Sequence, residues 1–249
     1  MSALPEFLTF AIVGALAQLV DGALGMAYGV TSAGLLLGLG MPPVMASASV
    51  HYAETFTCGA SGLSHLAAGN VRRRLFLALA IPGVIGALVG VWLAVHLPAP
   101  WMRVALTPYL LGMGLFLLLR GARRPGERAE PPRGTPLLGA AAGFVDAIGG
   151  GGWSALTATT LLARGLQPRV VIGSVHLAKC AVSIAASTGF LAGIGAGHVT
   201  AVLGLIAGGI LAAPFGAFFV RRIPARAATV LAGLAVLALG INNAVRVLH

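Results

Sequence analysis

The chain has 249 residues, of which 58% are hydrophobic and only 9% are charged, and its formal net charge is +10. In a soluble globular domain about a quarter of the residues are charged, so the composition excludes a soluble domain. It predicts an all-α integral membrane protein. The positive charge does not predict a nucleic-acid partner, because nearly all the arginines lie in short stretches between apolar segments, as in the cytoplasmic loops of membrane proteins.

Ten apolar segments follow one another along the chain in two sets of five. The first set covers 7–24, 26–40, 44–68, 75–97 and 101–120, and the second covers 136–149, 152–164, 170–194, 200–220 and 227–247. A polar, proline-rich stretch separates the two sets, which is typical of a loop. We therefore predict one membrane domain with a first repeat at 1–120, a cytoplasmic linker at 121–135 and a second repeat at 136–249.

The two sets are related by an internal repeat. A shift of 125 residues aligns 14–64 with 139–189 without a gap and places Asp21 on Asp146. Because each half has five segments, an odd number, the second half is predicted to be inverted relative to the first. Short, glycine-interrupted segments at matching places in inverted halves are typical of broken or re-entrant helices that meet near the membrane midplane. We predict this architecture here.

The arginines predict the orientation of the chain. Thirteen of the fifteen arginines fall in loops that share one side of this topology, which leaves only Arg103 and Arg246 on the other side. The side rich in arginine is expected to be the cytoplasm. This orientation places 41–43 outside, 166–168 inside and both termini outside.

Three acidic residues, Asp21, Glu54 and Asp146, and the sole lysine, Lys179, lie inside apolar segments. A charge in the bilayer costs a few kcal/mol, so each is a candidate functional group. Asp21 and Asp146 precede the glycines of each half and are predicted to cap the N-terminus of the short helix that follows. Glu54 and Lys179 are equivalent in the two repeats, so they are expected to approach and pair; a purely structural ion pair stays open.

The four glycines Gly149, Gly150, Gly151 and Gly152 stand directly before the helix that begins near Trp153. They leave backbone N–H groups exposed at the positive end of a helix dipole, an arrangement that attracts anions. Glycine runs also allow helices to pack closely in membranes. The short helix at the predicted midplane favours anion binding.

The third segment of each half adds polar groups on one helical face. His51 and Glu54 share a face in the first half, and His176 and Lys179 share the matching face in the second. Imidazole changes charge near neutral pH, so His51 is a candidate for proton coupling. Glu54, on the same face, is a candidate for proton coupling or for an ion pair. Methionines that could form a soft-metal path have no counterparts in the second half, and we predict no metal site and no cofactor.

The stretches GALAQLVDGALGM (14–26) and GAAAGFVDAIGGGG (139–152) resemble those of the sulfite exporter TauE/SafE family. The resemblance covers nearly the whole chain and implies a transporter of sulfur-containing anions in a prokaryotic cytoplasmic membrane. It also implies that 149–152 and the counterpart at 22–29 contribute to the site. The predicted substrate-binding residues are Gly25, Met26, Tyr28, His51, Gly149, Gly150, Gly151, Gly152, Trp153, His176 and Lys179.

The leading hypothesis is a secondary transporter that moves sulfite, a sulfonate or a related organosulfur anion by alternating access, with proton coupling left open. We do not predict an enzyme. The alternatives are an anion channel, and an intramembrane enzyme in which His51 and Glu54 perform acid–base chemistry on a lipid-borne substrate. The expected partners are the anion and membrane lipids, and a homodimer is compatible with the sequence.

Overall fold

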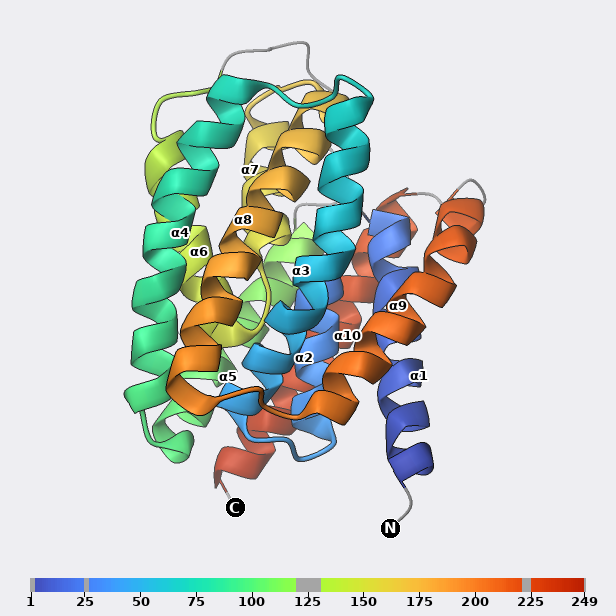
Figure 1. Ribbon diagram of the computed structural model, residues 1–249, viewed down its shortest axis with the longest axis vertical. Coiled ribbons are helices and arrows are strands. Elements are labelled where there is room, and N and C mark those ends of the chain that lie inside the picture. The colour runs from blue at the N-terminus through green and yellow to red at the C-terminus, as the bar shows by residue number, and fades with distance from the viewer. Residues whose placement is uncertain (1–2, 25–26, 120–130, 221–224, 249) are drawn as a thin grey trace.

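The computed structural model describes residues 3–24, 27–119, 131–220 and 225–248, which form ten α-helices joined by short connections (Figure 1). The prediction of an all-helical chain is confirmed, and each helix coincides with one predicted apolar segment. The helices are α1 Ala3–Leu24, α2 Tyr28–Gly38, α3 Pro43–Ala67, α4 Arg73–His96, α5 Ala99–Leu119, α6 Thr135–Gly149, α7 Trp153–Ala163, α8 Pro168–Ile194, α9 Val199–Val220 and α10 Ala225–Leu248.

Two helices in the described ranges are long and apolar enough to cross a membrane on the criteria of length and composition. They are α4, with 24 residues, and α8, with 27 residues. At 1.5 Å per residue these helices extend over roughly 36 and 40 Å. Each therefore exceeds the roughly 30 Å of hydrocarbon in a bilayer.

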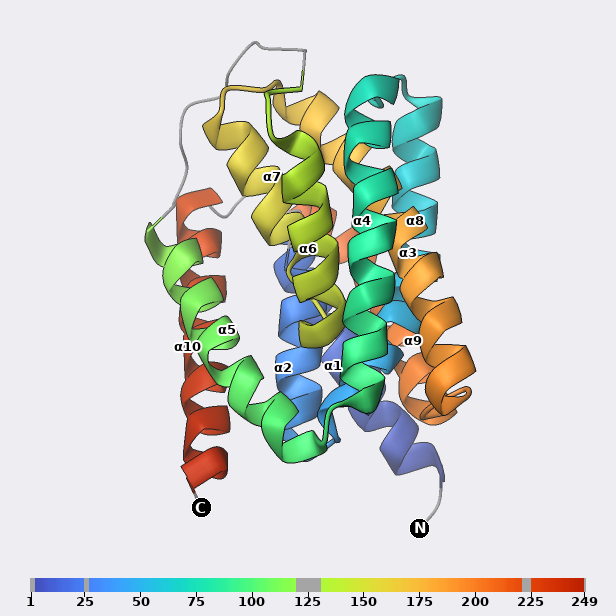
Figure 2. The same ribbon diagram turned by 90° about the vertical axis from the view of Figure 1, so that its left-hand side faces the viewer.

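Helices α2 and α7 are the shortest, with 11 residues each. A helix of that length extends over about 16 Å and cannot cross a bilayer. Figure 2 shows α2 in the half of the molecule near the termini and α7 in the opposite half. The helices that precede them differ in length, because α1 has 22 residues and α6 has 15.

Both termini lie at the same end of the bundle, together with the α2–α3 connection (Figure 1). The α3–α4 and α7–α8 connections lie at the opposite end. We call this opposite end the arginine end, because its connections or adjoining helix starts carry Arg72, Arg73, Arg74, Arg164 and Arg169. The loops at 41–43 and 166–168 therefore occupy opposite ends, which is their predicted relative placement.

Glycines allow the most extensive helix pairs to pack at close range. Helix α1 packs mainly on α9, α4 on α6, α3 on α8 and α5 on α10, and Figure 2 shows the last three pairs side by side. A Cβ atom on Gly143 of α6 would collide with the carbonyl oxygen of Gly83 on α4, and one on Gly86 of α4 would collide with that of Ala140. Small residues at such crossings are typical of helix packing in membranes.

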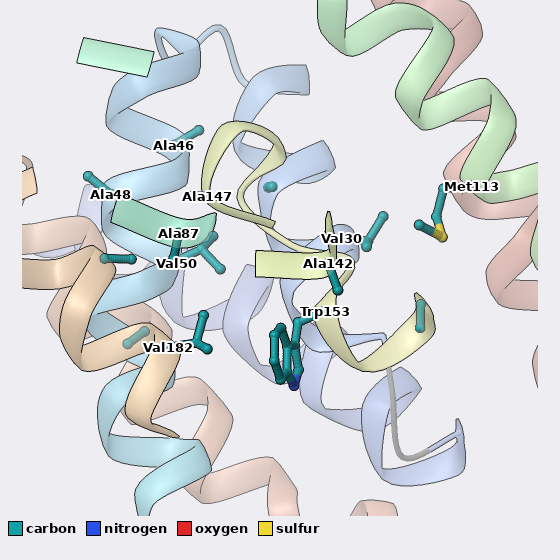
Figure 3. Close-up of a cluster of buried hydrophobic side chains, with 14 of the residues drawn as sticks. Val30, Ala46, Ala48, Val50, Ala87, Met113, Ala142, Ala147, Trp153 and Val182 are labelled. Carbon is teal, nitrogen blue, oxygen red and sulfur yellow. The ribbon is translucent and has the colours of Figure 1, made fainter. Parts of the chain in front are cut away.

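The start of α7 is anchored in the core by Trp153, which is completely buried. Figure 3 shows its ring among small side chains such as Ala142 and Val182. A Cβ atom added to Gly83 would lie 2.6 Å from this ring, so glycine makes the space for it. The indole N–H donates to the carbonyl oxygen of Val175 at 3.2 Å. These contacts hold the N-terminus of α7 between α4 and α8.

Candidate functional site

Three charged side chains meet in the interior of the bundle. The Lys179 ammonium on α8 lies 2.5 Å from Asp146 Oδ2 on α6 and 2.7 Å from Glu54 Oε2 on α3. All three residues are almost fully buried, with exposed fractions of 2%, 0% and 3% respectively. Glu54 and Lys179 approach as their equivalence in the repeat predicts, and Asp146 adds a second carboxylate that the repeat does not predict.

Asp146 lies in the last turn of α6 and bridges the break before α7. Its Oδ1 accepts the backbone N–H of Trp153 at 2.9 Å, and its carbonyl oxygen accepts the N–H of Gly151 at 3.1 Å. Gly150 and Gly152 adopt φ values of +69° and +113°, which glycine reaches without a steric penalty. The carboxylate thus satisfies one of the free N–H groups at the start of α7, which is what a cap does.

His51 and Ser47 attach α3 to the end of α6. His51 Nε2 lies 3.2 Å from Asp146 Oδ2, and its Nδ1 lies 2.9 Å from the carbonyl oxygen of Ser47. The Ser47 hydroxyl donates to the carbonyl oxygen of Ala147 at 2.5 Å. The His51 ring also packs against Phe190 of α8, with 5.8 Å between the ring centroids. Two adjacent turns of α3 therefore position the carboxylate of Asp146.

The corresponding break in the first half is bridged by Asp21. Its Oδ1 accepts the backbone N–H groups of Ala27 and Tyr28 at 2.7 and 3.0 Å. These two bonds connect the end of α1 to the start of α2 in the manner predicted for a cap. Gly25 and Met26, which we predict as substrate contacts, lie outside the described residues.

The break before α7 touches the first turn of α2 through glycine backbone, and we call this the contact between the two breaks. A Cβ atom on Gly151 would collide with the main chain of Gly29 and Val30, and one on Gly29 would lie 2.8 Å from the Cα atom of Gly151. The Tyr109 hydroxyl of α5 donates to the carbonyl oxygen of Gly151. The ring of the same tyrosine leaves no space for a Cβ atom on Gly149. These glycines permit close contact between the breaks.

A cavity of about 350 Å³ adjoins the charged cluster. Its walls come from α1, α2, α3, the end of α6, the start of α7 with the break before it, and α8. The lining residues are Gln18, Asp21, Tyr28, Gly29, Glu54, Thr57, Cys58, Ser61, His65, Asp146, Gly152, Trp153, Ser154, His176 and Lys179. The ammonium and both carboxylates therefore border the cavity, although little of their surface is accessible.

The structure places the predicted substrate contacts in two groups. Tyr28, Gly152, Trp153, His176 and Lys179 line the cavity, together with the predicted caps and Glu54. The remaining described candidates, Gly149, Gly150, Gly151 and His51, do not form its wall.

Close packing explains why these candidates are away from the cavity. Gly149 packs against Tyr109, Gly150 against Ser47, and Gly151 against the α2 backbone. His51 lies behind the Asp146 carboxylate. For three of the four glycines, the close-packing interpretation of the run therefore describes the structure better than direct anion contact.

Three further residues of the cavity wall continue the polar face of α3. Cys58, Ser61 and His65 follow Glu54 at spacings of four, three and four residues, so they lie on one side of the helix. Ser61 Oγ lies 2.7 Å from His176 Nδ1, and the rings of His65 and His176 are 5.9 Å apart. The helical spacing is a signal from which Ser61 and His65 could have been predicted.

The cluster also brings together atoms of the type that bind cations. Ligating atoms of His51, Glu54 and Asp146 lie within 4.8 Å of one another. The Lys179 ammonium lies among them, in contact with both carboxylates. The Lys179 ammonium thus occupies the position between the carboxylates that a metal cation would take. We therefore assign no metal ligand among the described residues.

An apolar helical bundle with two short helices, and with a buried charged cluster beside a cavity between them, is the architecture of a membrane-embedded transporter. Comparison with known proteins identifies the family. The family model described as "Sulfite exporter TauE/SafE" matches residues 10–243, and the chain belongs to this family.

A relative from Bacillus subtilis (strain 168), described as "Probable membrane transporter protein YtnM", is 42% identical over 238 residues. The match covers 92% of this chain and 79% of the relative. No solved structure matches the chain. Both descriptions are of membrane transport, which agrees with the expectation that the protein is not an enzyme.

Proposed function

We propose that the protein is a secondary transporter of a small sulfur-containing oxyanion, such as sulfite or a sulfonate. The observation that carries this proposal is the Lys179 ammonium in the cavity wall, near the N-terminus of α7. An ammonium and a helix N-terminus both stabilise an anion, and Ser154 in the first turn of α7 lines the same cavity. The family description supports the choice of a sulfur oxyanion.

The charges of the cluster require that anion binding be accompanied by another change. Lys179 faces two carboxylates, and both hold its ammonium away from an anion in the cavity. One of these two contacts must be given up before the ammonium can turn to the anion. We therefore propose that Lys179 turns from Glu54 to the anion while Glu54 accepts a proton from the cavity. This exchange would couple anion movement to proton movement.

The lining residues indicate which end of the bundle the cavity faces. On α3 they run from Glu54 towards the arginine end as far as His65, and on α8 they include His176 and Lys179. On the terminus side, the site is closed by the contact between the two breaks and by the Tyr109 hydrogen bond. We propose that this is the state open to the arginine end.

We also propose that two inverted repeats move against each other during transport. Helix α1 of the first set packs on α9 of the second, and α6 of the second packs on α4 of the first. These two pairs are equivalent under the 125-residue repeat, and α2 and α7 lie in opposite halves of the bundle (Figure 2). Such exchange of partners is expected when two inverted repeats form one domain.

The orientation can be tested with single cysteines in a variant that lacks Cys58 and Cys180. With the arginine end in the cytoplasm of a prokaryotic cell, Pro42→Cys reacts with a membrane-impermeant maleimide added outside, and Gln167→Cys reacts only after the membrane is opened. Labelling of both positions from the same side contradicts the topology. Cysteines near the termini are expected to behave like position 42.

Transport is tested in proteoliposomes with radiolabelled sulfite and with a two-carbon sulfonate. We expect saturable uptake above that of empty liposomes, stimulation by unlabelled anion inside the vesicle, and a larger signal with a proton gradient. A channel would conduct without stimulation from the opposite side. If neither anion moves or binds under any gradient, the proposed function is wrong.

A further inference from the structure

His51 lies between two hydrogen-bond acceptors. On one side, Nδ1 is 2.9 Å from the backbone carbonyl oxygen of Ser47, and a carbonyl can only accept. On the other side, Nε2 is 3.2 Å from Asp146 Oδ2. Nδ1 must therefore carry a hydrogen, and a second hydrogen must lie between Nε2 and Oδ2. A neutral imidazole facing an ionised carboxylate would leave two lone pairs opposed.

The Lys179 ammonium decides on which atom this second proton resides. It lies 2.5 Å from the same Oδ2 atom of Asp146, and a positive charge at that distance stabilises the ionised carboxylate. This charge favours placing the proton on the imidazole, with His51 as a cation. The four groups His51, Asp146, Lys179 and Glu54 then carry two positive and two negative charges, and this balance is favourable for a buried cluster.

We propose that His51, as an imidazolium ion, is the counter-ion that holds Asp146 when Lys179 turns to the transported anion. The proposal rests on the proposed function and adds its control by protonation. With His51 charged, Asp146 keeps one cationic partner and the Trp153 N–H, so Lys179 is free to leave. With His51 neutral, Lys179 is the remaining cationic partner of Asp146 in the cluster and stays bound to it.

The surroundings of His51 support this assignment. From α6 it faces the Asp146 carboxylate, and from α8 the uncharged ring of Phe190 and the Lys179 ammonium beyond Oδ2. From its own helix it faces Glu54, whose carboxylate lies within 4.8 Å of the imidazole. His51 has no solvent exposure and is not part of the cavity wall. It is therefore a positioning residue, which acts on the anion through Asp146 and Lys179.

The protonation of His51 can be measured without any substrate. In the full-length protein labelled with ¹⁵N-histidine, two N–H protons are expected on His51 at neutral pH, with its signal assigned by its loss in His51→Asn. His96 provides the matched control, because its Nδ1 makes the same bond to a carbonyl four residues earlier at 2.7 Å. A single N–H on His51 below about pH 6, where a histidine is normally charged, overturns the proposal.

Binding of a labelled two-carbon sulfonate tests the consequence, because the sulfonate group stays ionised across the range of about pH 5 to 8 in which a histidine changes charge. In the wild type, sulfonate binding should weaken as the pH rises. His51→Asn should weaken binding by about tenfold, the factor expected for one hydrogen bond to a charged group, and should make binding independent of pH over this range. His51→Asn/Asp146→Asn should recover the affinity, since the new amide keeps an acceptor for the Trp153 N–H but no longer holds Lys179. His96→Asn should behave like the wild type.

The two proposals fail in different ways. If the wild type binds neither sulfonate nor sulfite at any pH, the proposed function is wrong, whereas the ¹⁵N measurement still decides the state of His51. If the wild type binds sulfonate and His51→Asn shows the same affinity and pH profile, the counter-ion role is wrong. A double variant as weak as the single variant also contradicts the role of Asp146 in holding Lys179.

Discussion

Lys179→Met is expected to abolish anion binding, with a loss of about a hundredfold or more in affinity. Methionine has a similar length but no charge, so the anion loses its contact with the ammonium. A hydrogen bond to a charged group contributes up to about 3 kcal/mol, which corresponds to about a hundredfold in affinity. The substitution also leaves Glu54 and Asp146 buried without the ammonium that both contact at present. Removing one partner from a buried ion pair costs about 3–5 kcal/mol of folding free energy. Radioligand binding and thermal unfolding in detergent measure the two losses.

The double variant Lys179→Met/Glu54→Gln separates folding from function. It removes one negative charge along with the positive charge, so most of the lost stability should return, while anion binding should remain absent. Recovery of binding in the double variant would show that Lys179 is not an anion contact. Unchanged affinity in the single variant would remove Lys179 from the mechanism.

Gly151→Ala is expected to have the second largest effect. The added methyl group would overlap the backbone of Gly29 and Val30, which cannot rotate away as a flexible side chain can. Overpacking of a buried site costs about 1–3 kcal/mol and occasionally more, and here the strain falls on the contact between the two breaks. We expect a lower unfolding temperature and strongly reduced transport in proteoliposomes.

Gly112→Ala is the matched control for this substitution. Gly112 lies within α5, and a Cβ atom there would meet no other atom within 4 Å. Alanine is about 1 kcal/mol more favourable than glycine inside a helix, so the control should be at least as stable as the wild type. Equal behaviour of the two variants would contradict the close contact between the breaks.

Much of the helical arrangement is predictable because it depends on local pattern. Long runs of apolar residues must form helices in a bilayer, since each backbone polar group needs a partner within its own segment. The glycines and prolines between the runs mark the ends of helices, and the short segment at 152–164 predicts the short helix α7. The pairing of Glu54 and Lys179 follows from their equivalence in the repeat.

The partners of Asp146 could not be predicted in the same way. Asp21 and Asp146 are equivalent in the repeat and both accept backbone N–H groups across a break. Only Asp146 contacts the Lys179 ammonium and the His51 ring, because the packing of α6 against α3 and α8 brings these groups together. Repeat equivalence preserves the local hydrogen bonds but not the contacts between helices, since the facing residues differ between halves.

The sequence by itself determined the class of the protein, the positions of its helices and breaks, and the small set of charged residues inside apolar segments. These depend on composition and on residues close together in the chain. Only the tertiary structure decided that most of the glycine run serves close packing, that His51 lies behind the cavity wall, and that one ammonium joins two carboxylates. The physical reason is that these features depend on the rotation and register of helices far apart in the chain, which helical periodicity alone does not specify.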